Sequence, residues 1–393
     1  MKRLFAAILA ACLLCGLTAC GGSKTAPESP TQPPEESAQP AEPEAESPIS
    51  AQPLDPESPA DPIEALVASM TLEEKVGQLF FSRCPAENAP QDAADYHLGG
   101  YILFGRDTKD KTANELIQSI ARCQEAAQIP LFIGVDEEGG TVVRVSSNPH
   151  LRSAKFQSPQ KLFAKGGMDA ILADTHEKDL LLKALGFNLN LAPVADLSTN
   201  SGDFIYARSF GQDAAATSDY ISAVVTQMAD DRMGSVLKHF PGYGNNVDTH
   251  TGIAVDKRSR EQFEQEDLLP FFAGIDAGAP CVLVSHNIVT CMDGDLPASL
   301  SPEVHRILRK ELGFEGVVMT DDLDMQAIAG YLDSSSAAVS AIRAGNDLVL
   351  SSDYKNQIPS VLAAVADGTL DETIIDTACT RVLRCKAQLG ILN

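Results

Sequence analysis

The stretch GVVMTD, residues 316–321, carries the pattern from which the fold of this chain can be predicted. A glycine precedes a short apolar run that contains two valines, and an acidic residue, Asp321, closes it. A short apolar run bounded by turn residues is typical of a strand that is buried on both faces. The acid at its end indicates where such a strand would leave the core.

Seven further runs of this kind occur along the chain, and helical patterns fill most of the gaps between them. The runs are QLFFS (78–82), YILF (101–104), LFIGVD (131–136), FNLNLAPVAD (187–196), SVLKHF (235–240), CVLVSH (281–286) and DLVLSS (347–352). Strands that alternate with helices favour an α/β fold, and eight of them predict a single (β/α)8 TIM barrel. A doubly wound open sheet is the alternative, but no G-x-G-x-x-G turn follows a strand.

The barrel is expected to span residues 63–393, and residues 1–62 have a different character. Lys2 and Arg3 precede an apolar stretch that is too short to span a bilayer, so residues 1–19 read as a signal peptide. LTAC, residues 17–20, resembles a bacterial lipobox, which predicts a lipid on Cys20. An ordinary secretory signal cut near Ala19 is the alternative. A lipid anchor would hold the protein on the outer side of the cell membrane.

Residues 20–62 are predicted to be a disordered tether. Residues 21–62 contain eleven of the 23 prolines and nine acidic residues, with Ser, Ala and Gln between them. Such a segment has too few apolar residues to form a core and stays extended. The formal net charge of −24 argues against a nucleic-acid partner, which would require a basic surface.

Six cysteines remain after residue 62, namely Cys84, Cys123, Cys281, Cys291, Cys379 and Cys385. They are scattered and form no C-x-x-C pair, so they predict neither a disulfide framework nor a structural metal site. We interpret most of them as buried thiols.

The predicted strands end in polar residues, and these ends should meet at one rim of the barrel. Asp136 ends the third run, Asp196 the fourth and Asp321 the seventh. Lys238 and His239 lie together at the end of the fifth run, where alternation predicts that only one of them faces the barrel centre unless the strand has already ended. Asp321 is therefore a candidate catalytic residue.

Other polar residues near the rim are open to a structural interpretation. Arg144 follows Asp136 by eight residues and could bind sugar hydroxyls or fix its loop through a salt bridge. Arg208 lies in the loop after the fourth run. His286 is expected to be structural or to line the site. Asp322 and Asp324 are expected to begin the next helix, where the helix dipole favours acids.

Asp248 and His250 lie two residues apart in a glycine-rich loop after the fifth run. A histidine titrates near neutral pH and can act as a general acid or base, and a nearby carboxylate would fix its tautomer. Two unrelated polar residues in a solvated loop would give the same spacing. Spacing alone leaves both interpretations open.

The loop motif KHFPGYGNNVDTH (238–250) resembles the K-H-F-P-G-H-G-x(4)-D-[ST]-H signature of glycoside hydrolase family 3, in its β-N-acetylglucosaminidase branch. DEEGGTVVR (136–144) is similar to the D-Q-E-G-G-x-V-x-R of that branch. MTDDLDM (319–325) is similar to its S/T-D-x-L-x-M segment. ARSFG (207–211) and LPASLSP (296–302) also match, and the resemblance covers residues 63–393.

The resemblance implies a TIM-barrel hydrolase that removes terminal β-linked N-acetylglucosamine with retention of configuration. It implies that Asp321 is the nucleophile and that His250, paired with Asp248, is the general acid/base, a role that a carboxylate fills in most retaining glycosidases. It implies sugar-binding roles for Asp136, Arg144, Arg208, Lys238 and His239. No metal or cofactor is implied. The expected partners are a carbohydrate, such as a peptidoglycan fragment, and the membrane through the lipid, and we expect a monomer.

Two residues depart from the motifs of the family. Tyr243 stands where the signature has its second histidine, so contacts to the sugar or the loop should differ there. Glu137 replaces the usual glutamine, which should add a charge near the loop that binds the sugar.

Four other functions remain alternatives at this point. The same fold could use phosphate instead of water as the acceptor, or could accept a broader range of β-glycosides. A metal-dependent hydrolase would use Asp248, His250, His286 and Asp321 as ligands, although QLFFS lacks the H-x-H that commonly opens such barrels. A sugar-binding lipoprotein without activity is the last alternative, and the intact acids and histidine disfavour it.

Overall fold

The structure, a computed structural model, describes residues 61–246, 252–325, 328, 332 and 334–392. The predicted signal peptide and residues 20–60 of the predicted tether, with Cys20, lie outside these residues, as do Asp248 and His250. Asp61 and Pro62, which were assigned to the tether, instead begin the helix Pro62–Ser69. All eight predicted strands are present. They are β1 (Phe80–Arg83), β2 (Gly100–Leu103), β3 (Phe132–Val135), β4 (Leu189–Asn190), β5 (Gly234–Phe240), β7 (Cys281–Val284), β9 (Val317–Thr320) and β10 (Val349–Ser351).

These strands form one parallel sheet in the order β10-β1-β2-β3-β4-β5-β7-β9. A single bridge between Met319 and Leu348 joins its two ends, so the sheet nearly closes into a barrel. Sequential strands are neighbours throughout, which is the topology that the alternation of strands and helices predicted. The open doubly wound sheet is therefore excluded.

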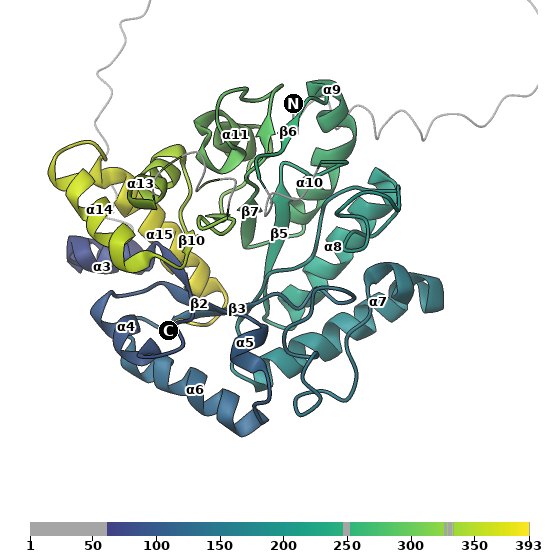
Figure 1. Cartoon of the computed structure of the whole chain (residues 1–393), viewed down its shortest axis with the longest axis horizontal. Helices are drawn as coiled ribbons and strands as arrows, with labels where there is room; N and C mark the ends of the chain where they lie inside the picture. Colours follow the sequence, from purple (N-terminus) through teal and green to yellow (C-terminus); the bar gives the residue numbers. More distant parts are fainter. Residues whose placement is uncertain (1–60, 247–251, 326–327, 329–331, 333, 393) are drawn as a thin grey trace, which may run out of the picture. The chain divides into compact units, whose positions relative to one another are not determined.

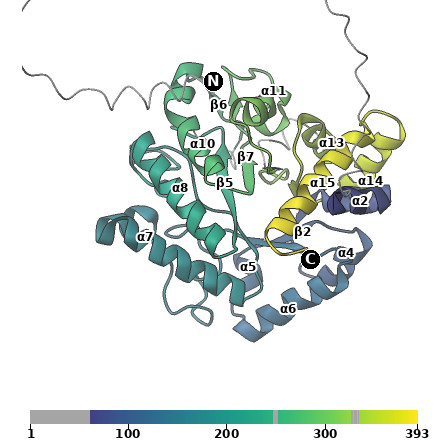
Figure 2. The same cartoon turned by 180° about the vertical axis from the view of Figure 1, so that it is seen from behind.

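Helices surround the sheet on its outer side in both views (Figures 1 and 2). The longer ones are α6 (Ala113–Ala126), α7 (Pro159–Ala184), α8 (Ala214–Asp230), α10 (Leu268–Asp276), α13 (Ser334–Ala344), α14 (Tyr354–Ala366) and α15 (Glu372–Gln388). The shorter ones are α2 (Pro62–Ser69), α3 (Leu72–Gln78), α4 (Ala89–Asp95), α5 (Gly105–Thr108), α9 (Arg260–Gln262) and α11 (Pro302–Arg306). Short π-helical turns, η3 (Phe263–Asp267) and η5 (Ile307–Glu311), extend α9 and α11, and η4 (Ala298–Leu300) is a 3-10 turn.

The apolar core has two layers that are separated by the sheet. The larger layer lies between the outer face of the strands and the helices. The interior layer fills the barrel with Phe81, Ile102, Phe132, Leu189, Leu191, Val236, Cys281, Leu283, Val317, Met319, Leu348 and Leu350, to which α15 adds Val382 and Cys385. Cys281 begins β7 and lies 3.9 Å from Cys385, sulfur to sulfur, so α15 covers the amino-terminal ends of the strands. The opposite, carboxyl-terminal end is left for the loops.

Local signals set most helix boundaries. Thr71 and Glu74 form a capping box, which begins α3. Residues 62–81 form α2, α3 and the start of β1, and the extended backbone of Met70 separates the two helices. A pair of two-residue strands, β6 (Val255–Asp256) and β8 (Ile288–Val289), was not predicted.

The six cysteines of the described chain are free thiols, and four of them are buried. No helix among the described residues is long and apolar enough to cross a bilayer.

Candidate active site

A cavity of about 780 Å³ opens at the carboxyl-terminal ends of the strands. Six of the predicted site residues line it, namely Asp136, Arg144, Arg208, Lys238, His239 and Asp321. Asp136 follows β3, Lys238 and His239 belong to β5, and Asp321 follows β9. The closure of the barrel thus brings the ends of β3, β5 and β9 together, as predicted from the ends of the apolar runs.

Lys238 lies at the centre of a buried ionic network. Its Nζ is 2.8 Å from Asp136 Oδ1 and 2.6 Å from Glu138 Oε1. The lysine is 2% exposed, so these carboxylates and not water compensate its charge. Arg144 approaches Asp136 from the other side, with 3.7 Å between Nη2 and Oδ2.

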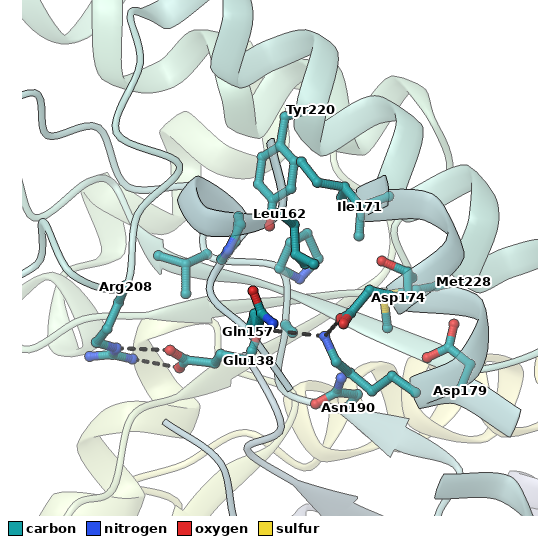
Figure 3. A pocket seen from close by; sticks show the side chains of 17 residues that line it. Glu138, Gln157, Leu162, Ile171, Asp174, Asp179, Asn190, Arg208, Tyr220 and Met228 are labelled. Atoms are coloured by element: carbon teal, nitrogen blue, oxygen red, sulfur yellow. Dashed lines mark hydrogen bonds and ion pairs between the residues drawn. The ribbon is translucent and has the colours of Figure 1, made fainter. Parts of the chain in front are cut away.

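Glu138 is the member of this network that the sequence analysis did not assign. Arg208 binds it side-on, with Nε to Oε2 at 3.0 Å and Nη2 to Oε1 at 2.7 Å (Figure 3). Burial alone would raise the pKa of Glu138, but the charges of Arg208 and Lys238 outweigh burial and hold the pKa well below its usual range. The carboxylate therefore stays ionised and holds both cations in fixed positions. The remaining N–H groups of Arg208 and Lys238 consequently point in fixed directions.

His239 connects this network to Asp196. Its Nδ1 lies 2.7 Å from Asp196 Oδ2, and its Nε2 lies 3.1 Å from Arg208 Nη2. A guanidinium only donates hydrogen bonds, so Nε2 accepts and Nδ1–H donates to the carboxylate. The ring is thereby fixed in one tautomer and one orientation.

Both Lys238 and His239 line the cavity, which corrects the expectation that only one would. Strand β5 continues to Phe240, so the strand has not ended at this point. The pairing register between β5 and β7 shifts between Leu237 and Phe240, and this irregularity breaks the alternation of side chains.

Asp321 is tied to the barrel by its backbone. Its N–H donates to the carbonyl oxygen of Val284 at 3.0 Å, which fixes the residue beside β7. Its Oδ1 accepts the N–H of Asp322 at 2.8 Å. A half-buried carboxylate is therefore held in a defined orientation at the wall of the cavity.

Asp322 and Asp324 also line the cavity and tie together the chain after β9. Asp322 Oδ1 accepts the N–H of Asp324 at 3.1 Å, and Asp324 Oδ2 accepts that of Ser352 at 2.9 Å. Burial, with the charges of Asp324 and Asp321, raises the pKa of Asp322 to about 6, although Arg83 opposes the shift. These contacts hold the chain after β9 in place, and the start of the helix that was expected here lies outside the described residues.

His286 is wholly buried and structural. Its Nδ1 lies 2.7 Å from Ser299 Oγ, and its Nε2 donates to the carbonyl oxygen of Asp322 at 3.0 Å. Both ring nitrogens are thus engaged in holding the chain next to Asp321. Within the described residues, no group of three or more His, Cys, Asp or Glu side chains comes together as a metal site.

Residues 71–385 match the family described as "Glycosyl hydrolase family 3 N terminal domain". The chain belongs to this family. It is 34% identical over 280 residues to a "Beta-hexosaminidase" of Xylella fastidiosa, covering 69% of this chain and 81% of that one. It is 30% identical over 326 residues to "Beta-hexosaminidase A" of Pseudoalteromonas piscicida, covering 75% of this chain but only 54% of the relative.

The fold is also similar to a solved structure from the same family. That structure is "a glycoside hydrolase family 3 beta-N-acetylglucosaminidase from Paenibacillus sp. str. FPU-7", with a TM-score of 0.77 and 31% sequence identity. The match covers 82% of this chain and 63% of the Paenibacillus chain. The nearly closed sheet is therefore the TIM-like barrel of family 3.

Glu137, the first departure from the family motif, lies against the loop that carries Arg144, as expected, and does not line the cavity. It is fully buried and its Oε2 accepts the backbone N–H groups of Arg144 and Val145, both at 2.7 Å. Its Oε1 accepts the N–H of Ser146 at 3.1 Å and also contacts the Ser146 hydroxyl. In this family 3 domain the carboxylate shapes the loop that presents Arg144.

Tyr243, the second departure, lies under the cavity wall rather than in the cavity. It is 2% exposed, and its backbone N–H donates to Asp196 Oδ1 at 2.8 Å. Its ring meets the His239 ring edge-on, with 5.4 Å between centroids. Tyrosine thus packs against a predicted sugar-binding residue and does not replace one.

Arg258 fixes the described residues on both sides of residues 247–251, although no sequence pattern had singled it out. Its guanidinium binds the carboxylates of Asp256 and Asp267, each at 2.7 Å, and the carbonyl oxygen of Gly242 at 3.1 Å. Asn246 Nδ2 donates to Asp256 Oδ2 at 2.6 Å. Burial raises the pKa of Asp267 to about 6, although Arg258 opposes the shift.

A second cavity, of only about 20 Å³, lies behind Glu138, between the barrel and helices α7 and α8 (Figure 3). Asp174 and Lys178 of α7 form an ion pair there, at 3.3 Å. Burial raises the pKa of the neighbouring Asp179 to about 8, against the charge of Lys178. This volume holds about one water molecule, so the cavity is not a sugar site.

Proposed function

We propose that the protein is a retaining exo-glycosidase that removes terminal, non-reducing β-linked N-acetylglucosamine. The observation that carries the proposal is that Asp321 shares one cavity with the anchored cations Lys238 and Arg208. The 34% identical relative is named a β-hexosaminidase and the similar solved structure a β-N-acetylglucosaminidase, which supports the same activity here.

Sugar binding follows from the donors and acceptors of the buried network. Lys238 and Arg208 supply N–H donors, Asp136 supplies acceptor oxygens, and each is fixed by at least one charged partner. A sugar hydroxyl both donates and accepts, so neighbouring charged donors and acceptors can bind it in a single orientation. Because these groups are held before the substrate arrives, little ordering is required on binding.

The reaction proceeds in two displacements. First, the Asp321 carboxylate bonds to the anomeric carbon while the bond to the glycosidic oxygen breaks, and His250 gives its proton to that oxygen. Next, His250 takes a proton from water, and the water oxygen displaces Asp321 from the anomeric carbon. Asp248, two residues before His250 in the signature, would hold the imidazole in the required tautomer.

The natural substrate in this proposal is a peptidoglycan fragment outside the cell membrane. The proposal rests on the signal-like residues 1–19 and the Pro- and Glu-rich residues 20–62, which would tether the domain to a lipid on Cys20. Retention of a Cys20→Ala variant in the membrane fraction, at the wild-type level, would argue against the anchor.

The deciding experiment is turnover of a matched pair of aryl substrates, a β-N-acetylglucosaminide and a β-glucoside. We expect the wild type to prefer the first, and Asp321→Asn to reduce its kcat by more than about 1,000-fold, because the amide cannot act as the nucleophile. Asp324→Asn, which changes a neighbouring acid of the same cavity, should lose much less.

Several outcomes would change the assignment. Near-normal turnover by Asp321→Asn would exclude Asp321 as the nucleophile, and equal turnover of both substrates would indicate a broader β-glycosidase. Formation of a sugar 1-phosphate when phosphate is added would identify a phosphorolytic enzyme. Loss of activity in a strong chelator, with recovery on adding metal, would support the metal-dependent alternative.

A further inference from the structure

Phe204 is an exposed aromatic residue on the wall of the active-site cavity. It is 39% exposed and lines the cavity together with Ala207 and Arg208 of the same loop. The ionic network beside it consists of charged and polar groups, so the exposed phenyl ring adds an apolar surface next to them. Its ring offers no hydrogen bond and can contact only an apolar face of a ligand.

The ring of Phe204 is held from behind by Tyr243. The two ring centroids are 5.8 Å apart at an angle of 46°. Tyr243 also packs with Val194 and Ile205 in a small apolar cluster that is separate from the main core. Tyr243 therefore fills the space between Phe204 and His239, where the family signature has a histidine.

The backbone of the Phe204 loop is also fixed. Asp203 accepts hydrogen bonds from Ser198 Oγ at 2.8 Å and from Asn200 Nδ2 at 3.0 Å. Gln160 of α7 donates to the carbonyl oxygen of Tyr206 at 2.6 Å. Phe204 is thus exposed on a loop that is held in place on both sides, which is what a preformed binding surface requires.

The position of Phe204 points to the leaving-group side of the cavity. The sugar that is cleaved requires the charged groups around Lys238 and Arg208, which bind hydroxyls. Phe204 instead packs on Tyr243 and has no group that binds a hydroxyl. Its ring is therefore suited to the part of the substrate that the charged groups do not bind, which is the leaving group.

We propose that Phe204 is a platform for the aglycone, on which the apolar face of a second sugar ring rests, and that Tyr243 is its positioning residue. The proposal rests on the proposed function, because it assumes cleavage of a β-linked N-acetylglucosamine. It assigns substrate preference to residues that make no contact with the bond that is broken. The aglycone class is a pyranose, not a small or strongly charged group.

The test compares a substrate with a sugar aglycone with one that has almost no aglycone. The first is a β-1,4-linked disaccharide of N-acetylglucosamine, and the second is β-N-acetylglucosaminyl fluoride. Phe204→Ala should lower kcat/KM for the disaccharide about tenfold, the loss expected for one aromatic contact, and change that for the fluoride less than about twofold. Phe204→Tyr should restore the disaccharide activity, and Phe204→Leu should not.

Phe163→Ala is the matched control, because Phe163 is 41% exposed but lies on α7 and does not line the cavity. It should leave the ratio of the two kcat/KM values unchanged. Tyr243→Phe should keep the wild-type ratio, whereas Tyr243→Ala should lower it, because the ring that supports Phe204 is lost.

The outcomes separate this proposal from the proposed function. If the wild type cleaves both substrates and Phe204→Ala leaves the ratio unchanged, the platform is wrong and the activity stands. An equal loss on both substrates would place Phe204 with the cleaved sugar and would also overturn the platform. If the wild type cleaves neither substrate, the proposed activity itself fails.

Discussion

Glu137 and Glu138 are adjacent acids with opposite tasks. Glu138 is an ionised anchor for Lys238 and Arg208 at the cavity, whereas Glu137 turns inward and accepts backbone N–H groups. Neighbouring side chains in an extended segment point in opposite directions, so the two adjacent acids reach different partners. The sequence marks the pair but does not indicate which acid takes which task.

Glu137→Gln tests this division of tasks at the residue scale. Glutamine is the residue of the family motif, but only one of its two terminal groups can accept a hydrogen bond. Its NH2 group would take the place of one carboxylate oxygen and would face a backbone N–H that this oxygen now binds. We expect the free energy of unfolding to fall by about 1–3 kcal/mol, as for a buried donor left without an acceptor. Urea denaturation measures this.

Glu73→Gln is the matched control, because Glu73 is exposed at the start of α3 and should change stability by less than about 0.5 kcal/mol. A Glu137→Gln variant as stable as the wild type would mean that the loop accommodates either residue. In that case the departure from the family motif would have no structural consequence.

At the scale of elements, Arg258 joins the loop after β5 to strand β6 and to the π-helical turn η3. Its contacts to Gly242, Asp256 and Asp267 cross three segments of the chain. A guanidinium can bind two carboxylates side-on and still donate to a carbonyl, which an ammonium cannot do with the same geometry. The two ends of the loop are thereby kept at a fixed separation.

Arg258→Lys should therefore affect catalysis through the loop. We expect turnover of an unactivated alkyl glycoside to fall about tenfold or more, and turnover of a nitrophenyl glycoside to fall less, because only the first requires a well-placed proton donor. The free energy of unfolding should fall by about 3 kcal/mol, since a buried carboxylate loses its best partner. Kinetics with both substrates and urea denaturation measure these changes.

Two further variants serve as comparisons for Arg258→Lys. His250→Ala should show the same dependence on the leaving group, to a greater extent. Arg306→Lys, which alters an exposed pair with Glu303, should behave as the wild type. An equal loss by Arg258→Lys on both glycosides would indicate a general effect on the fold and would exclude a role in positioning the loop.

The elements themselves were largely predictable, and the exceptions have a common cause. The eight main strands follow from apolar runs of strand length, and α3 from its capping box. The β6–β8 pair has two residues in each strand, which is too short for any period to be visible. Its pairing depends on contacts between the loops and not on local sequence.

At the scale of the whole molecule, the two ends of the barrel differ in chemistry. The carboxyl-terminal end holds the charged cavity, and the amino-terminal end is closed by α15 around Lys386. That lysine is fully buried, and its Nζ donates to Gln78 Oε1 at 2.7 Å. Burial lowers the pKa of Lys386 from its usual 10.5 to about 7. Because Lys386 lies at the opposite end of the barrel from the cavity, we expect its burial to affect the stability of the fold.

This pKa predicts a dependence of stability on pH. Between pH 7 and 10.5 the unfolded chain holds a proton on Lys386 that the folded protein lacks, so folding releases a proton and stability rises with pH. The unfolding free energy of the wild type, minus that of Lys386→Met, should therefore increase by about 1–3 kcal/mol between pH 7 and 9.5. Denaturation at several pH values measures the difference.

Lys165→Met is the control, because Lys165 is exposed and its replacement should shift the whole stability curve without changing its shape. Parallel curves for the wild type and Lys386→Met would show that Lys386 titrates alike in the folded and unfolded states. The unpaired Gln78 oxygen in the variant contributes at every pH and so does not affect this comparison.

The sequence by itself determined the barrel, the order of its strands and the rim at which Asp136, Lys238 and Asp321 meet. Periodicity and strand ends are set by neighbours along the chain and can be read from them. Only the tertiary structure decided that Glu138 anchors the cations, that both Lys238 and His239 face the cavity, and that Tyr243 supports Phe204. These contacts join residues far apart, such as Lys238 and Asp136, which are 102 positions apart in the chain. Their geometry is fixed by barrel closure, because partners that distant meet only once all strands are in register.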